Sequence, residues 1–296
     1  MQTCVILNPH AGSVEDVKHV EAAVQRLGDL KLVTTERPGD GLHMAREAVE
    51  QGCEFVVAAG GDGTINEVVN GLAKHFDRAV LGVLPMGTGN DFARSIGVPT
   101  EIDAAVALLA HRQTRPLDVV RVTSDEVRHF INVSAGGFSG LVDEKLTEEL
   151  KRSWGPLAYL RSAAEALPDL TDYHTFITFD DDEQHEVKTY NIVIANARYV
   201  AGGIPIAPQA LLDDGLVDVL VIPVASMPQL ALLVPQVLLG QHLASDLVSF
   251  RRARKVRIES QPGMWFNADG ELVGNQPATF EVLPKALQVV VGTLAA

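Results

Sequence analysis

The chain has 296 residues, of which 47% are hydrophobic and 21% are charged, and its formal net charge at pH 7 is −14. Such a composition is typical of a globular protein with room for two domains of about 150 residues each. The acidic balance argues against general nucleic-acid binding, which needs a basic surface. The N-terminus shows no signal-peptide pattern and no apolar run is long enough to span a bilayer, so we expect a cytoplasmic protein. Cys4 and Cys53 lie in or beside apolar segments, and we expect both to be buried, reduced thiols.

Strand-like and helix-like patterns alternate up to about residue 120. Strands are expected at residues 3–7, 30–35, 54–59 and 79–85. After the third of these, apolar residues recur at helical spacing, namely Ile65, Val68, Val69 and Leu72. Strands that alternate with amphipathic helices predict a parallel α/β sheet with right-handed crossovers. In such a sheet, ligands bind at the carboxyl ends of the strands.

The second part of the chain has short alternating or β-rich runs separated by turn residues. These runs lie at 118–123, 128–134, 173–180, 186–197, 215–223, 254–260, 264–270 and 278–284. Helical patterns remain at 141–167 and 228–243. We therefore expect a mostly antiparallel second domain, folded as a β-sandwich.

Two glycine loops follow two of the expected parallel strands. The first contains Gly60, Gly61, Asp62, Gly63 and Thr64, and the second contains Gly87, Thr88, Gly89, Asn90 and Asp91. The first is not a Walker A loop, because no Gly-Lys-Ser/Thr follows it, and a dinucleotide fingerprint would need glycine or alanine at Asn66. Their shared composition and neighbouring strands favour one common site.

The chemistry of these loops suits a phosphate ligand. Backbone N–H groups and threonine hydroxyls can hold phosphates at a helix start, and the carboxylates can act through Mg²⁺, which prefers oxygen ligands. Asp62 would then face a metal ion or its waters. The alternative is that both loops are tight turns in which an aspartate caps a helix.

Six segments, in this order, resemble the diacylglycerol kinase catalytic-domain family, and most closely its bacterial lipid kinases. They are NPHAG (8–12), GGDGTINE (60–67), PMGTGNDFAR (85–94), INVSAGGF (131–138), GGIPIAPQALLDDGLVDV (202–219) and NADGE (267–271). The resemblance covers nearly the whole chain. Ala201 stands where a third glycine is frequent in the family, and Ala268 precedes the Asp-Gly-Glu.

The resemblance implies two domains with the nucleotide between them. Residues 1–122 would form a phosphofructokinase-like α/β domain that binds the nucleotide, with 286–296 returning to it. Residues 123–285 would form the β-sandwich that receives the lipid.

The resemblance also implies site residues. The ATP-contacting positions would be Asn8, Thr35, Gly60, Gly61, Asp62, Gly63, Thr64, Ile65, Asn66, Glu67, Gly87, Thr88, Gly89 and Asn90. The catalytic carboxylates would be Asp62, Asp91, Asp118, Asp269 and Glu271. Among these, Glu271 would be the general base with Asp269 in support, and Asp118 would support the metal–water network.

A separate structural Mg²⁺ site is also implied. There Asp214 would supply its carboxylate, and Leu211 and Leu216 their backbone carbonyls. From the residues alone, the Asp-Asp-Gly at 213–215 is a good turn.

The function expected is an ATP- and Mg²⁺-dependent lipid kinase that phosphorylates a hydroxyl of diacylglycerol or a related lipid. The alternatives are an NAD kinase-like enzyme and a nucleotide-binding regulatory protein that has lost catalysis. A lipid kinase is expected to contact the membrane surface transiently, as a peripheral protein, and a homodimer stays open. The basic run 251–257 either touches an anionic membrane or is the solvated face of a strand, which we favour.

Overall fold

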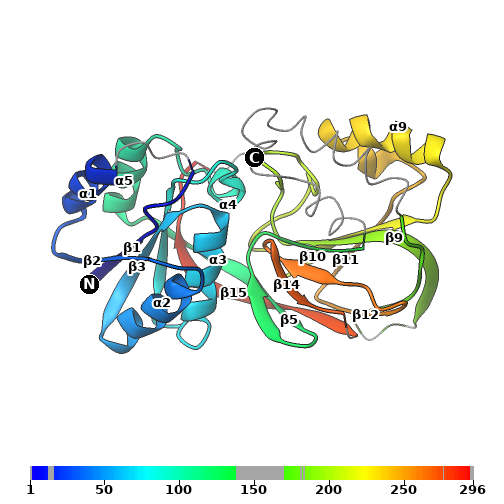
Figure 1. Ribbon diagram of the computed structural model, residues 1–296, viewed down its shortest axis with the longest axis horizontal. Helices are drawn as coiled ribbons and strands as arrows, with labels where there is room; N and C mark the ends of the chain where they lie inside the picture. Colours follow the sequence, from blue (N-terminus) through cyan, green and yellow to red (C-terminus); the bar gives the residue numbers. More distant parts are fainter. Residues whose placement is uncertain are drawn as a thin grey trace. The chain divides into compact units, whose positions relative to one another are not determined.

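The computed structural model describes residues 2–12, 17–137, 170–180, 182, 184–275 and 277–293 (Figure 1). The chain divides into an N-terminal unit, Met1–Val119 with Pro284–Ala296, and a C-terminal unit, Val120–Leu283. The helix expected at 141–167 lies outside the described residues.

The N-terminal unit is built on a parallel sheet with the strand order β15-β4-β3-β1-β2. Its strands are β1 (Gln2–Leu7), β2 (Leu30–Thr34), β3 (Cys53–Gly60), β4 (Val80–Pro85) and the last part of β15 (Ala278–Val290). Gln288 and Val289 of β15 pair in parallel with Val80 and Leu81 of β4. The predicted parallel α/β sheet is therefore confirmed, and the last strand of the chain belongs to it.

Helices connect the strands of this sheet. They are α1 (Val17–Val24), the 3₁₀ turn η1 (Gln25–Leu27), α2 (Asp40–Glu50), α3 (Asp62–Leu72), α4 (Asp91–Ser95) and α5 (Ile102–His111). The apolar stripe expected after β3 forms the inner face of α3, where Ile65, Val68, Val69 and Leu72 are buried. The sequence patterns did not give bounds for α4 or α5. The apolar residues of α5 give no distinct helical period, and its start depends on side chains rather than on a pattern.

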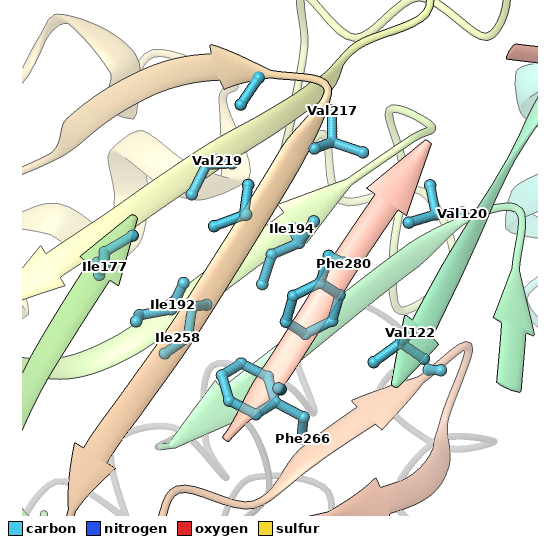
Figure 2. Packing of buried hydrophobic residues seen from close by; sticks show 14 of the residues in the cluster. Val120, Val122, Ile177, Ile192, Ile194, Val217, Val219, Ile258, Phe266 and Phe280 are labelled. Carbon is cyan, nitrogen blue, oxygen red and sulfur yellow. The ribbon is translucent and has the colours of Figure 1, made fainter. Parts of the chain in front are cut away.

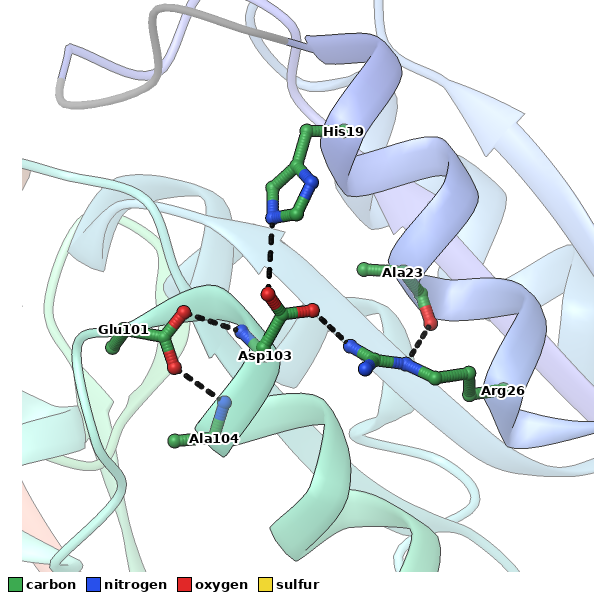
Figure 3. Close-up of polar contacts among 6 residues, drawn as sticks. All are labelled: His19, Ala23, Arg26, Glu101, Asp103 and Ala104. Carbon is green, nitrogen blue, oxygen red and sulfur yellow. Dashed lines mark hydrogen bonds and ion pairs between the residues drawn. The ribbon is translucent and has the colours of Figure 1, made fainter.

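The start of α5 is fixed by two carboxylates (Figure 3). Glu101 accepts hydrogen bonds from the backbone N–H groups of Asp103 and Ala104, at 3.0 and 2.7 Å, and so satisfies two donors that have no partner within the helix. The side chain of Asp103 pairs with Arg26 and lies 3.4 Å from Nε2 of His19. These contacts tie α5 to α1 and η1.

The C-terminal unit is antiparallel in every strand pair whose register is described. Its strands are the last part of β5 (Thr114–Thr123), β6 (Val127–Phe130), β7 (Val133–Gly137), β8 (Tyr173–Phe179), β9 (His185–Ala195), β10 (Val217–Pro223), β11 (Ser249–Ala253), β12 (Lys255–Gln261), β13 (Phe266–Ala268), β14 (Glu271–Gly274) and the first part of β15. The antiparallel second domain was predicted correctly. The short strands β11 and β14 were not predicted as separate elements.

Two hydrophobic clusters organise this unit. The larger one is enclosed by the strands and includes Phe266 and Phe280, whose rings meet edge to face with centroids 5.2 Å apart (Figure 2). The smaller one lies between the sheet and α9 (Met227–Leu238), which carries Leu233 into it. The sheet that contains β9 and β10 therefore has apolar residues on both faces.

The cysteines behave as expected. Both are free and buried, and burial raises the pKa of the Cys4 thiol to about 12, with the nearby Cys53 adding to the shift. Cys4 therefore stays protonated and unreactive at neutral pH.

Candidate functional site

The two glycine loops touch each other at the carboxyl ends of β3 and β4. The backbone N–H of Met86 donates to the carbonyl of Gly60 at 2.8 Å. A Cβ atom on Gly87 would lie 2.6 Å from the Cα of Gly61, and one on Gly61 would lie 3.1 Å from the Cα of Gly87. Only glycine allows this approach, which explains why each loop carries one there.

The second loop is shaped by Asn90. This residue adopts a left-handed backbone conformation with φ 52°, which asparagine tolerates well. Its side chain accepts from the N–H of Gly87 at 2.8 Å and donates to the carbonyl of the same residue at 2.7 Å. Asn90 is buried, so its side chain maintains the loop.

Asp62 links the first loop to the helix that follows the second. Its carboxylate oxygens accept from the N–H groups of Asp91 and Phe92, each at 3.2 Å, at the start of α4. Asp62 therefore caps a helix, and that helix follows the other loop. Each carboxylate oxygen can accept a further hydrogen bond, so this contact leaves capacity for a ligand or its waters.

Asn8, at the end of β1, joins the same edge of the sheet. Its side-chain amide donates to the hydroxyl of Thr64 at 3.0 Å. A Cβ on Gly12 would lie 3.3 Å from the Cγ2 of Thr88, so the segment after β1 approaches the second loop. The backbone N–H of Thr35, a buried residue at the end of β2, donates to the carbonyl of Leu7 at 2.9 Å.

Several of the expected nucleotide contacts differ in their exposure. Gly63 and Thr88 are exposed, whereas Ile65 and Asn66 are buried, and the backbone N–H of Ile65 already donates to the carbonyl of Gly61 at 3.0 Å. Glu67 accepts from the N–H groups of Gly39 at 2.7 Å and Gly41 at 2.9 Å. Both oxygens of Glu67 thus hold the start of α2, a role that the sequence did not reveal.

Asp118 and Asp91 are nearly inaccessible, at 1% and 6% exposure. Asp118 accepts from the N–H of Lys285 at 2.6 Å, where the backbone of β15 has a left-handed φ of 52°. Asp91 begins α4, and its carbonyl accepts from the hydroxyl of Ser95 at 3.0 Å. Asp118 therefore supports β15 within the N-terminal unit.

In the C-terminal unit, Asp269 anchors a strand far away in the sequence. It sits with Gly270 in the two-residue turn between β13 and β14, and both have positive φ, at 48° and 92°. Its carboxylate accepts from the N–H groups of Ile131, Asn132 and Val133, at 3.1, 3.0 and 3.0 Å. Asp269 thus holds the start of β7. This contact between the segments 131–138 and 267–271 could not be predicted from the sequence.

Glu271 differs from Asp269 in being exposed. It is the first residue of β14, and its register partner Ala268 is fully buried. Its carboxylate makes no hydrogen bond to the part of the chain that the structure describes. The turn therefore presents one anchored carboxylate and one available carboxylate.

Three asparagines hold backbone groups in and beside β7, and no role was predicted for them from the sequence. Asn196 donates to the carbonyl of Ile131 at 2.9 Å, and Asn132 donates to the carbonyl of Tyr199 at 3.0 Å. The side chain of Asn267 accepts from the N–H of Ala135 at 3.1 Å. Asn132 and Asn267 lie in the segments 131–138 and 267–271, which was the only signal for them, and Asn196 lies in none of the six segments.

The loop expected to hold the structural Mg²⁺ lies before β10. The carboxylate of Asp214 accepts from the N–H of Leu216 at 3.0 Å, so the turn interpretation holds, and both Asp214 and Leu211 are exposed. Arg252 donates to the carbonyl of Gln209 and to the buried Asp218, each at 2.8 Å.

Burial raises the pKa of Asp218, and Arg252 opposes the shift. Leu216 also lines a cavity of about 500 Å³ with Asp180, Arg254 and Lys255.

Comparison with known protein families agrees with these observations. The diacylglycerol kinase catalytic domain matches residues 2–122, and the YegS C-terminal NAD kinase beta sandwich-like domain matches residues 132–291. The chain belongs to the diacylglycerol kinase catalytic-domain family, and its C-terminal unit is of the β-sandwich class, as expected.

Individual relatives span the whole molecule. A diacylglycerol kinase of Bacillus subtilis (strain 168) is 33% identical over 97% of this chain and 95% of its own length. One of Staphylococcus carnosus (strain TM300) is 32% identical over 96% and 93%. A crystal structure of a diacylglycerol kinase from Bacillus anthracis str. Sterne superposes with a TM-score of 0.81 at 25% identity, covering 98% of this chain and 97% of that one.

The chain is therefore a lipid kinase. Within the described residues, no helix has both the length and the apolar character needed to cross a membrane.

Proposed function

We propose that this enzyme transfers the γ-phosphate of ATP to a hydroxyl of diacylglycerol or a related lipid, with Mg²⁺ and with Glu271 as general base. The observation that carries the proposal is the pair of glycine loops whose backbones touch at Gly61 and Gly87 and are bridged by Asp62. Phosphoryl transfer depends mainly on positioning and on charge stabilisation, and such a backbone supplies the positioning.

The N-terminal unit would bind the nucleotide. The first turn of α3 leaves backbone N–H groups without intrahelical partners, and these can donate to phosphate oxygens. The exposed hydroxyl of Thr88 can add a donor from the second loop. Asn8, through its bond to Thr64, orients the first turn of α3.

Mg²⁺ fits the residues present. Asp62 is partly exposed, and its two oxygens use one acceptor position each on α4, so it can still accept hydrogen bonds from metal-bound water. When bound, Mg²⁺ neutralises the charge that develops on the transferred phosphoryl group. Replacing Asp62 with asparagine should therefore reduce kcat on the order of a thousandfold.

Glu271 would take the proton of the acceptor hydroxyl. A lipid alcohol is a poor nucleophile, so a positioned carboxylate is needed to receive its proton as the oxygen attacks. Glu271 is exposed and stands beside a turn that Asp269 fixes through three backbone bonds. Asp269 supports catalysis in this proposal by holding that turn.

The second metal would be structural. Asp214 keeps one carboxylate oxygen outside its bond to Leu216, and the neighbouring carbonyls of Leu211 and Leu216 offer the hard oxygen ligands that Mg²⁺ prefers. Arg252 holds the carbonyl of Gln209 and so fixes this loop from one side.

An NAD kinase-like activity is the second candidate, because the matching C-terminal domain is described as NAD kinase beta sandwich-like. The test is incubation of the wild type with labelled ATP and either total lipid extract or NAD. We expect a labelled lipid and no labelled dinucleotide, and faster labelling of NAD than of every lipid would reverse the assignment.

The variant Glu271→Gln tests the mechanism. Because Glu271 is exposed and has no bonded partner among the described residues, its replacement should leave the melting temperature and the Kd for ATP unchanged while kcat falls at least about a hundredfold. Glu259→Gln, which likewise replaces a carboxylate with an amide, on β12, is the matched control and should keep its kcat. Near-normal kcat in the Glu271→Gln enzyme would remove Glu271 from the mechanism.

A further inference from the structure

Residues 219–245 contain no aspartate, glutamate, lysine or arginine, in a chain that is 21% charged. This segment includes the end of β10 and all of α9. Its only polar side chains are serine, glutamine and one histidine. A surface helix normally carries charges on its outer side, so the composition of α9 requires an explanation.

One side of α9 packs on the sheet. Leu230 and Leu233 are buried, and Leu233 joins the hydrophobic cluster formed with β9 and β10. Ser226 and Gln229 form a capping box that fixes the start of the helix. In Figure 1, α9 (yellow) lies along this sheet within the C-terminal unit.

The opposite side of α9 is also apolar, and it is exposed. Leu232 and Leu239 have 67% and 68% of their surface accessible, and Met227 has 40%. Leu232 and Leu239 are seven residues apart and therefore lie on the same face of the helix, with Pro235 between them. We call Met227, Leu232, Pro235 and Leu239 the outer face of α9.

A helix that is apolar on two opposite faces is normally covered on both, by protein or by lipid. The length of α9 decides between spanning a bilayer and lying on it. Twelve residues reach about 18 Å, well short of the roughly 30 Å hydrocarbon core. Such a helix can only lie along the surface of a bilayer, with its outer face among the acyl chains.

We propose that the outer face of α9 docks onto the lipid bilayer that carries the acceptor. The proposal rests on the lipid acceptor of the proposed function. The contact with the bilayer is expected to be apolar and not electrostatic, because the chain has a net charge of −14 and is repelled by anionic lipid.

The basic run at 251–257 offers little electrostatic compensation. Arg251 pairs with Asp182, Arg252 with Asp218, and Arg257 with Glu259, so three of its cations are already engaged. The run is the solvated face of strands, as favoured from the sequence. Docking must therefore depend on apolar side chains, which makes binding to a neutral bilayer insensitive to salt.

The test is flotation of purified protein with vesicles of neutral phosphatidylcholine, in about 50 mM and about 500 mM NaCl. The wild type should float with them equally at both salt concentrations. Replacing Leu232 and Leu239 together with glutamine, a residue of similar helix propensity, should weaken binding about a hundredfold, roughly tenfold for each side chain. Val127→Ser is the matched control, since Val127 is 60% exposed on β6 and should not affect binding.

Enzyme activity provides a second measurement. The double variant should phosphorylate a short-chain, monomeric diacylglycerol as the wild type does, and lose activity only on vesicles. A wild type without lipid kinase activity would count against the proposed function. Flotation does not depend on that activity and would still test whether the outer face of α9 binds the bilayer.

Three results would overturn the proposal: a wild type that does not float, equal flotation of the double variant, or binding that vanishes at high salt. A dimeric wild type that becomes monomeric in the double variant, with unchanged flotation, would assign the outer face to a second copy of the chain instead.

Discussion

Replacing Asp269 with asparagine tests whether this residue holds the start of β7. The carboxylate accepts three backbone N–H groups, from Ile131, Asn132 and Val133. Asparagine tolerates the left-handed φ of 48° at this position, so the backbone of the turn is not strained by the change. Its carbonyl oxygen can still serve Asn132 and Val133, but its NH₂ group would face the N–H of Ile131.

The magnitude follows from these contacts. One hydrogen bond to a charged acceptor is lost, which costs about 1.5 to 3 kcal/mol. The other two become bonds between neutral groups, which are roughly half as strong. Together these losses amount to about 3 to 6 kcal/mol, and they should lower the melting temperature by roughly 6 to 24 °C.

Thermal unfolding measures the loss, and hydrogen exchange locates it. Exchange should quicken first at the amides of Ile131, Asn132 and Val133. Asp246→Asn, at an exposed aspartate of the same unit, is the control and should melt with the wild type. A melting temperature for the Asp269→Asn protein within about 2 °C of the wild type, with unchanged exchange at those amides, would refute the anchoring role.

Three further changes have defined outcomes. Asp214→Ala should lower the melting temperature by several degrees. EDTA should lower the melting temperature of the wild type in the same way, but not that of the variant. A wild type whose melting temperature does not change with EDTA would contradict a structural metal. Ala201→Gly should stabilise the fold by up to about 1 kcal/mol in urea unfolding, because Ala201 has φ 53°; a loss of stability would show that this conformation is not strained. Burial, with Arg121 adding, lowers the pKa of His129 from 6.5 to about 4, so protonation favours the unfolded state. The free energy of unfolding should therefore fall as the pH drops from 6.5 towards 4, by about 1 kcal/mol at pH 5 after solvent screening. Urea unfolding of the His129→Gln protein should not show this loss. An unchanged pH dependence in that variant would exclude His129 as the cause.

The sequence predicts the architecture well where local patterns and packing agree. The stripe Ile65, Val68, Val69 and Leu72 faces the core of the N-terminal unit, and every predicted parallel strand is present within one or two residues. The helix α5 was missed because its residues are apolar on most sides and its start depends on Glu101. Periodicity cannot detect a helix that has no polar face.

The sequence suggests the residue types of the candidate site but not their contacts. The glycine loops suggested one shared site, and the contact between Gly61 and Gly87 agrees with that expectation. The partner of Asp62 lies 29 residues further on, and those of Asp269 lie more than 130 residues away. Such distant pairings arise from strand order, which no local pattern contains.

Strand β15 has a consequence for how the protein is made. Its first part pairs with β12 and its last part with β4, so both units depend on residues 278–290. During synthesis, β4 is the open edge of a parallel sheet until those residues have left the ribosome. The N-terminal unit is thus encoded first but completed last, and a nascent chain stalled before residue 278 would present β4 to any neighbouring strand.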